Sequence, residues 1–214
     1  MDKQSIFVLG AGGHAKVLLD CLRLNKNIHV LGILDTEQQL HGKSILGFNV
    51  IGNENEILKK YSPIDIKLVN GIGSIQLPLL RENIFIKFKK AGFSFLNVIH
   101  PSAYIGQDAL LGEGVQVFAG SIIQPGCRVG DNVIINTNAS IDHDCHIGNH
   151  VHLAPGVVCC GDVTIGRGTH VGSGAIILQG TQIGDHCLIG AGAVVTHNIA
   201  AVSKVAGVPA RILE

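Results

Sequence analysis

The stretch SIDHDCHIGNHVHLAPG, residues 140–156, is dense in histidine and aspartate. Side chains of these types can hold a metal ion, supply a general base for proton transfer, or form a solvated polar surface. A zinc site needs three or four ligands that converge on one point. The choice between these readings therefore depends on where the local structure places each side chain.

A second candidate is the stretch GAGGHA, which begins at Gly10. Backbone N–H groups at the start of a helix bind phosphate, and glycines such as Gly12 and Gly13 let the phosphate approach closely. Ala15 stands where the dinucleotide-binding pattern G-x-G-x-x-G has its third glycine, so the match is imperfect. Asp35 ends the next apolar run and could bind a ribose hydroxyl. Glycines that serve only packing are the alternative.

The elements around this loop alternate between strand and helix. Short apolar runs that end in glycine or aspartate are followed by segments with helical spacing. The expected strands are residues 5–10, 29–35 and 65–73, and the expected helices are residues 12–25, 55–61 and 78–93. This alternation favours a small parallel sheet of the Rossmann type, which we assign to residues 1–98.

From about residue 100 an aliphatic side chain recurs at every sixth position, with Cys159 as the exception. The series is Ile105, Leu111, Val117, Ile123, Val129, Ile135, Ile141, Ile147, Leu153, Cys159, Ile165, Val171, Ile177, Ile183, Ile189 and Val195. A helix of period 3.6 cannot use this spacing, whereas a hexapeptide repeat forms one short strand and one corner from each hexad. Three hexads make a triangular coil, so residues 99–214 should form a stacked prism.

The residue directly before each inward position should point outward from a flat face of the prism. One stripe comprises Tyr104, Ile122, Ser140, Val158, Ile176 and Val194; a second comprises Leu110, Arg128, His146, Thr164 and Gln182; a third comprises Gln116, Ile134, His152, His170 and Leu188. The first stripe is mostly apolar, and exposed apolar stripes of this size mark interfaces. A closed trimer is the simplest assembly that would cover it.

His143 and Asp144 fall at the corner that follows the apolar stripe, so they would border a groove between subunits. Neutral imidazole has an unperturbed pKa near 6.5 and suits the removal of a proton from an attacking amine. A neighbouring carboxylate can hold the imidazole tautomer and raise its basicity. A solvated pair without a catalytic role is the alternative.

The other histidines give no metal site. His152 and His170 should stack one coil apart, but no third ligand lies beside them in the repeat. We expect His146, His150, His170 and His186 to lie at the surface.

The composition excludes several classes of protein. Lys+Arg and Asp+Glu number 16 each, aromatic residues make up 4% and tryptophan is absent, so no nucleic acid partner is expected. No window of about 18 uncharged apolar residues predicts a membrane span, and the apolar run at the N-terminus is too short for a signal peptide, so a cytoplasmic location is expected. The 6 cysteines lack C-x-x-C spacing and are expected to be reduced structural thiols.

The hexapeptide repeat and the ending AGVPARIL resemble those of the left-handed parallel β-helix acyltransferases. GAGGHAKV, NVIHPSA and NTNASIDHDC extend the resemblance over nearly the whole chain. Together these motifs resemble the nucleotide-sugar N-acetyltransferases that include the GDP-perosamine and UDP-4-amino-sugar enzymes, with sialic acid O-acetyltransferases as relatives. The resemblance implies an N-terminal Rossmann-like domain, a left-handed β-helix, a homotrimer and acetyl-CoA as co-substrate.

The resemblance also assigns roles to individual residues. His143 takes the position of the catalytic base and Asp144 that of its acidic partner, where some relatives carry glutamate. The resemblance places His152, Gly161 and Ser173 in the acetyl-CoA site. The substrate positions that it implies are Gly13, His14, Ala15, Asp35, Thr36 and Gly73.

The expected reaction is direct transfer of an acetyl group to the amine of a nucleotide-linked 4-amino-4,6-dideoxysugar. O-Acetylation of a sugar of the sialic acid type and a non-catalytic sugar-nucleotide-binding scaffold are the alternatives. The residues of the glycine loop leave the nucleobase open among UDP, GDP and dTDP.

Overall fold

The computed structural model describes residues 3–213 and divides into two compact units. The first unit comprises the residues up to Gly73 together with Asn83–Val98, and the second comprises Ser74–Glu82 together with Ile99 onward. The segment Ser74–Glu82, here called the strap, therefore belongs with the second unit although it lies within the first part of the sequence. The sequence pattern gave no sign of this excursion.

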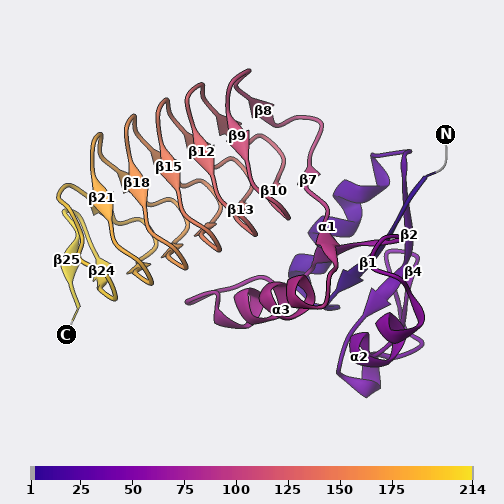
Figure 1. Ribbon diagram of the computed structural model, residues 1–214. Coiled ribbons are helices and arrows are strands. Elements are labelled where there is room, and N and C mark those ends of the chain that lie inside the picture. The colour runs from indigo at the N-terminus through magenta and orange to yellow at the C-terminus, as the bar shows by residue number, and fades with distance from the viewer. Residues whose placement is uncertain (1–2, 214) are drawn as a thin grey trace. The chain divides into compact units, whose positions relative to one another are not determined.

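The first unit is built on a sheet of order β3-β4-β2-β1-β5-β6 (Figure 1). Its strands are β1 (Gln4–Leu9), β2 (Ile28–Leu34), β3 (Ser44–Ile45), β4 (Phe48–Gly52), β5 (Lys67–Asn70) and β6 (Ser94–Phe95), and its helices are α1 (Gly13–Arg23) and α2 (Glu54–Ile57), with 3₁₀ turns η1 (Gln38–Leu40) and η2 (Leu58–Lys60). The helix α3 (Leu79–Lys90) is shared: its first turn lies in the strap, and the rest belongs to the first unit. The strands pair in parallel except for β3 with β4. This is the predicted Rossmann-like arrangement.

Two details of the first unit differ from the sequence prediction. The β3–β4 hairpin was not expected; it turns at Leu46 and Gly47, which both have positive φ. The strand expected over residues 65–73 ends at Asn70, because Gly71 and Gly73 belong to the following loop.

The second unit is a β-helix whose three faces are sheets of short strands (Figure 1). The strands pair in parallel, except that β24 and β25 at the C-terminal end pair antiparallel. The apolar face comprises β8 (Tyr104–Ile105), β11 (Ile122–Ile123), β14 (Ser140–Ile141), β17 (Val158–Cys159), β20 (Ile176–Ile177) and β23 (Val194–Val195). The groove face comprises β9 (Leu110–Leu111), β12 (Arg128–Val129), β15 (His146–Ile147), β18 (Thr164–Ile165) and β21 (Gln182–Ile183). The strap face comprises β7 (Val98–Ile99), β10 (Gln116–Val117), β13 (Ile134–Ile135), β16 (His152–Leu153), β19 (His170–Val171), β22 (Leu188–Ile189), β24 (Lys204–Ala206) and β25 (Arg211–Ile212).

The six-residue period has two structural causes. The aliphatic series fills a continuous core, in which Ile123, Ile141 and Ile177 are fully buried. A residue with positive φ also recurs every six positions at the corners, where it is glycine or one of Asn132, Asn138, Asp144, His150, Asp162 and His186. Asparagine, aspartate and histidine are the non-glycine residues that tolerate this left-handed conformation best. Asp144 thus adopts the left-handed backbone conformation that the corner requires, in addition to supplying a carboxylate.

The strap covers part of one face of the prism. Ser74 contacts His152 and His170, and the guanidinium of Arg81 donates to the carbonyl of Asn132. Since His150 and His170 are buried, their expected surface positions are wrong. The repeat gives the direction of each side chain, but it does not reveal that a segment remote in sequence packs on this face.

Further along the strap, Glu82 forms an ion pair with Arg167. This pair and the contacts of Ser74 and Arg81 attach both ends of the strap to the prism.

The described cysteines are free thiols, and all are buried except Cys160, which is half-buried. Their burial agrees with the expected structural role, and the reduced state stays a prediction.

Candidate active site

The corner between β14 and β15 presents an exposed histidine–aspartate pair. The Nδ1 atom of His143 lies 2.8 Å from Oδ2 of Asp144. The backbone fixes both residues: the N–H of His143 donates to Oδ1 of Asp142 at 2.7 Å, and the N–H of Asp144 donates to the carbonyl of Pro125 at 3.1 Å. The contact assigns the ring proton to Nδ1 and leaves the lone pair on Nε2.

Electrostatics tune this imidazole toward basicity. The hydrogen bond that His143 donates to Asp144 raises the pKa of His143; desolvation opposes this shift and the charge of Asp142 adds to it. A carboxylate that accepts from Nδ1 favours the protonated ring, which is the state that forms when Nε2 removes a proton. The pair therefore has the arrangement of a general base with an orienting carboxylate.

Gly161 lies beneath the imidazole, one coil further along the same corner. A Cβ atom built on Gly161 would lie 2.7 Å from both Cε1 and Nε2 of His143, so a side chain here would displace the ring. Within residues 3–213, the N–H of Gly161 meets no hydrogen-bond acceptor. The structure thus brings His143, Asp144 and Gly161 together at one corner.

The other two residues assigned to acetyl-CoA lie elsewhere on the chain. His152 is on the strap face, where it is only 5% exposed and both ring nitrogens have partners, Ser74 and Asn136. Ser173 is exposed at the corner between β19 and β20. Within one chain neither residue joins the corner that carries His143.

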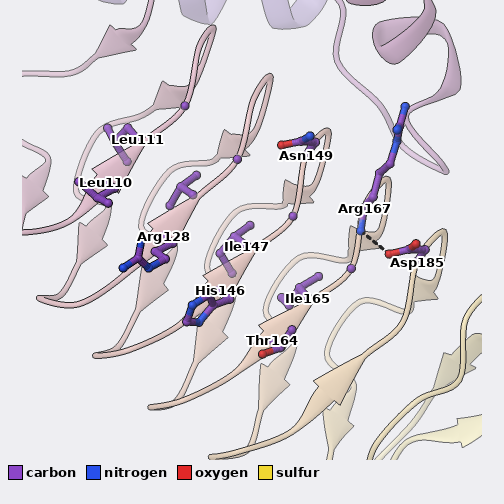
Figure 2. Close-up of a pocket in the computed structure, with 15 residues that line it drawn as sticks. Leu110, Leu111, Arg128, His146, Ile147, Asn149, Thr164, Ile165, Arg167 and Asp185 are labelled. Atoms are coloured by element: carbon purple, nitrogen blue, oxygen red, sulfur yellow. Dashed lines mark hydrogen bonds between the residues drawn. The ribbon is translucent and has the colours of Figure 1, made fainter.

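A shallow groove of about 630 Å³ lies on the groove face, and Figure 2 shows the residues that line it. Leu110, Arg128, His146 and Thr164 line it from successive strands, with Asn149, Arg167 and Asp185 at its edge. Of these residues, His146 also contacts the corner that carries His143, because its Nδ1 atom lies 3.2 Å from the carbonyl oxygen of Asp144. The sequence predicted the stripe but not the hollow.

The glycine loop of the first unit leads into α1. Gly12 occupies the N-cap position, and no side chain within the described residues caps the helix there. Gly10 has φ +93°, and a Cβ atom on it would lie 2.9 Å from the side chain of Ile72. Glycine is therefore required at this position for the fold of the loop itself. Cβ atoms on Gly12 and Gly13 would meet open space, so these two glycines leave room for a ligand. The first N–H groups of α1 suit an anion.

Asp35 braces this loop. Its Oδ2 atom accepts from the N–H of Ala11 and its Oδ1 atom from the N–H of Glu37, each at 2.8 Å. Each carboxylate oxygen keeps a second lone pair, so a ribose hydroxyl can still be accommodated. Thr36 is exposed beside it.

The remaining loop positions differ in what they offer a ligand. The side chain of Ala15 is fully buried in the core, so only its backbone can serve a ligand. Gly73 packs against His14, since a Cβ on it would lie 3.0 Å from the Cβ of His14.

Within the described residues, no set of three or more His, Cys, Asp or Glu side chains could hold a metal ion. None of the helices in the described part of the chain has the length and apolar character needed to cross a bilayer.

Comparison with protein families gives two matches. The PglD N-terminal domain model matches residues 5–88, and the bacterial transferase hexapeptide model matches residues 108–142, 126–161 and 162–197. Among curated proteins, none matches the chain.

Solved structures match over the whole chain. The acetyltransferase domain of PglB from Neisseria gonorrhoeae FA1090 is 33% identical, with 99% of this chain and 100% of that chain covered and a TM-score of 0.90; it is also solved with acetyl coenzyme A. PerB from Caulobacter crescentus, in complex with CoA and GDP-perosamine, is 35% identical, with 98% and 97% covered and a TM-score of 0.88. WeeI from Acinetobacter baumannii AYE is 26% identical, with 99% and 100% covered and a TM-score of 0.87.

The fold and the site define a hexapeptide-repeat acyltransferase with a left-handed β-helix and an N-terminal α/β domain. Within that class, the chain belongs to the family of acetyl-CoA-dependent nucleotide-sugar N-acetyltransferases. The predicted fold class, family, co-substrate and enzymatic activity are confirmed. The alternative of a non-catalytic scaffold is therefore wrong.

Proposed function

We propose that this chain transfers the acetyl group of acetyl-CoA directly to the amino group of a nucleotide-linked 4-amino-4,6-dideoxysugar, with His143 as the general base. The observation that carries the proposal is the imidazole of His143, held by Asp144 at Nδ1 and lying with Nε2 over Gly161. A base must lie within hydrogen-bond reach of the proton that it removes, and Nε2 at an exposed corner is open to a substrate.

The proposed step is an addition followed by an elimination. The neutral sugar amine attacks the thioester carbonyl, forming the C–N bond, while Nε2 of His143 takes the proton that the nitrogen loses. The carbonyl oxygen becomes an oxyanion, for which the N–H of Gly161 is our candidate donor. The oxyanion then re-forms the C=O bond as the C–S bond breaks, and the imidazolium of His143 gives its proton to the departing thiolate, which leaves as CoA. The chain offers no thiol nucleophile in this motif, because the side chain of Cys145 is fully buried in the core.

The acceptor is held by the first unit in this proposal. The N–H groups of Gly13, His14 and Ala15 at the start of α1 would bind the diphosphate, which the uncapped helix end and the open space at Gly13 support. Asp35 and Thr36 would bind the ribose. GDP-perosamine, the ligand of the Caulobacter relative, is a substrate of the class that we propose.

We further propose a homotrimer that buries the apolar face. Tyr104, Ile122, Val158 and Ile176 on that face are each at least 36% exposed in the single chain. Because His143 lies at the edge of this face, the active sites would form between subunits. The acetyl-CoA cleft would then combine Gly161 of one chain with His152 and Ser173 of another. Acetyl-CoA and nucleotide sugars are metabolites of the cytoplasm, where we place the reaction.

The test is thiol release from acetyl-CoA with a panel of UDP-, GDP- and dTDP-linked 4-amino-4,6-dideoxysugars. Each acceptor is paired with its 4-hydroxy counterpart and with the free sugar as controls. We expect turnover of one nucleotide-linked amine and none of its hydroxyl counterpart, with an amide in the product. Turnover of a free sugar hydroxyl instead would establish O-acetylation and contradict the proposal.

A further inference from the structure

The first residue of the strap inserts a hydroxyl between two buried histidines. The Oγ atom of Ser74 lies 2.8 Å from Nδ1 of His152 and 3.4 Å from Nδ1 of His170. The two rings meet edge to face, with centroids 4.8 Å apart and planes at 88°. Their exposed fractions are 5% and 6%, so this polar contact lies away from bulk water.

The neighbouring amide sets the direction of the hydrogen bonds. Oδ1 of Asn136 accepts from the N–H of Thr137 at 2.8 Å, so the NH₂ group faces Nε2 of His152 at 3.2 Å. An NH₂ group can only donate, so Nε2 of His152 must carry the lone pair and the ring proton must lie on Nδ1.

The proton on Nδ1 of His152 determines the direction of the remaining hydrogen bonds. Nδ1–H of His152 donates to the oxygen of Ser74, and the single hydroxyl proton of Ser74 is left to donate to Nδ1 of His170. His170 therefore carries its proton on Nε2. Burial lowers the pKa of His170 to about 4, which keeps that ring neutral and able to accept.

This hydrogen-bond chain anchors a position next to the glycine loop. Ser74 directly follows Gly73, which packs on His14 at the start of α1. Because Ser74 is covalently bonded to Gly73, a displacement of Ser74 would also shift Gly73, which contacts His14.

We propose that Ser74, Asn136 and His170 are positioning residues: they hold His152 as its Nδ1–H tautomer and fix Gly73 where the nucleotide sugar binds. The part that concerns the nucleotide rests on the proposed function, whereas the tautomer does not. His152 then holds the strap through its hydrogen bond to Ser74. Both of its ring nitrogens are engaged, so neither is available as a base.

The tautomer is tested by long-range ¹H–¹⁵N NMR of the full-length protein with labelled histidine, with the His152 signal assigned from its loss in His152→Gln. We expect the Nδ1–H form in the wild type. In Asn136→Asp the carboxylate accepts from Nε2, so His152 should change to the Nε2–H form. The Nε2–H form in the wild type would overturn the proposal, whatever the enzyme acetylates.

The positioning role is tested by kinetics and by calorimetry with UDP, GDP and dTDP. Loss of the Ser74 hydroxyl in Ser74→Ala should raise KM for the nucleotide sugar and Kd for the preferred nucleotide about tenfold, with kcat changed less than threefold. Ser74→Thr should restore both values, and Ser44→Ala is the matched control on the exposed β3 strand. Unchanged KM and Kd in Ser74→Ala would refute the positioning role. If no nucleotide binds the wild type, the proposed function fails, while the NMR result still decides the tautomer.

Discussion

At the scale of single residues, the repeat determines which side chains can react. His143 stands at a corner because the preceding hexad places Ile141 in the core, and Asp144 turns the chain with φ +61°. These positions could be predicted, because they depend only on counting from the aliphatic series. The partners of His152 could not be predicted, because Ser74 lies 78 residues away in sequence. Counting within the repeat cannot reveal such a contact.

Asp144→Asn tests the orienting carboxylate. Asparagine tolerates the positive φ at this corner, so the backbone should hold. Because the carboxylate raises the pKa of His143, its loss should lower that pKa, and the neutral base will persist to lower pH. We expect the acid limb of the kcat/KM profile to move to lower pH and the plateau to fall by about tenfold to a hundredfold. An acid limb that stays in place would show that Asp144 does not act on the base.

Gly161→Ala tests whether the absence of a side chain at position 161 is needed to place the imidazole of His143. The added Cβ would lie 2.7 Å from Nε2 of His143, so the ring must move while the backbone N–H stays. We expect kcat to fall by about a hundredfold, since misplacement by an ångström costs this much. In the His143→Ala background, which has no ring to displace, the same change should cost little. Equal losses in both backgrounds would mean that Gly161 acts independently of His143.

At the scale of elements, the three faces of the prism carry different tasks. The strap face is partly covered by the strap, the groove face carries a shallow groove, and the apolar face is exposed. The sequence predicted the strands and the three stripes because the hexapeptide period is strong. It did not predict the β3–β4 hairpin, in which β3 has only two residues. It also did not predict the strap, whose contacts with the prism join residues far apart in sequence.

Val158→Asp tests the apolar face as an interface. Val158 is 37% exposed in the single chain, and a carboxylate in its place would be buried without a partner in a trimer. We expect light scattering to report monomers or a concentration-dependent mixture, with activity reduced in parallel. Gln182→Asp on the groove face is the control, because it adds the same charge to another outward position and should remain trimeric. An intact trimer in Val158→Asp would place the interface elsewhere.

At the scale of the whole molecule, two recognition tasks are divided between two units. The α/β unit offers an uncapped helix end to an anion, and the β-helix offers an exposed base. The family relationship is confirmed over nearly the entire chain. The sequence predicted both units because each has its own period. The nucleobase and the sugar do not follow from either period, because they depend on individual contacts in the loops.

The most direct test of the account is the steady-state kinetics of His143→Ala with acetyl-CoA and the preferred nucleotide-linked amino sugar. The account predicts that kcat falls by about a hundredfold to ten-thousandfold, while KM for both substrates changes little, because the base acts only in the transition state. The exposed position of His143 predicts an unchanged fold and oligomeric state. A variant that keeps kcat within threefold of the wild type would contradict the account and remove His143 from the reaction.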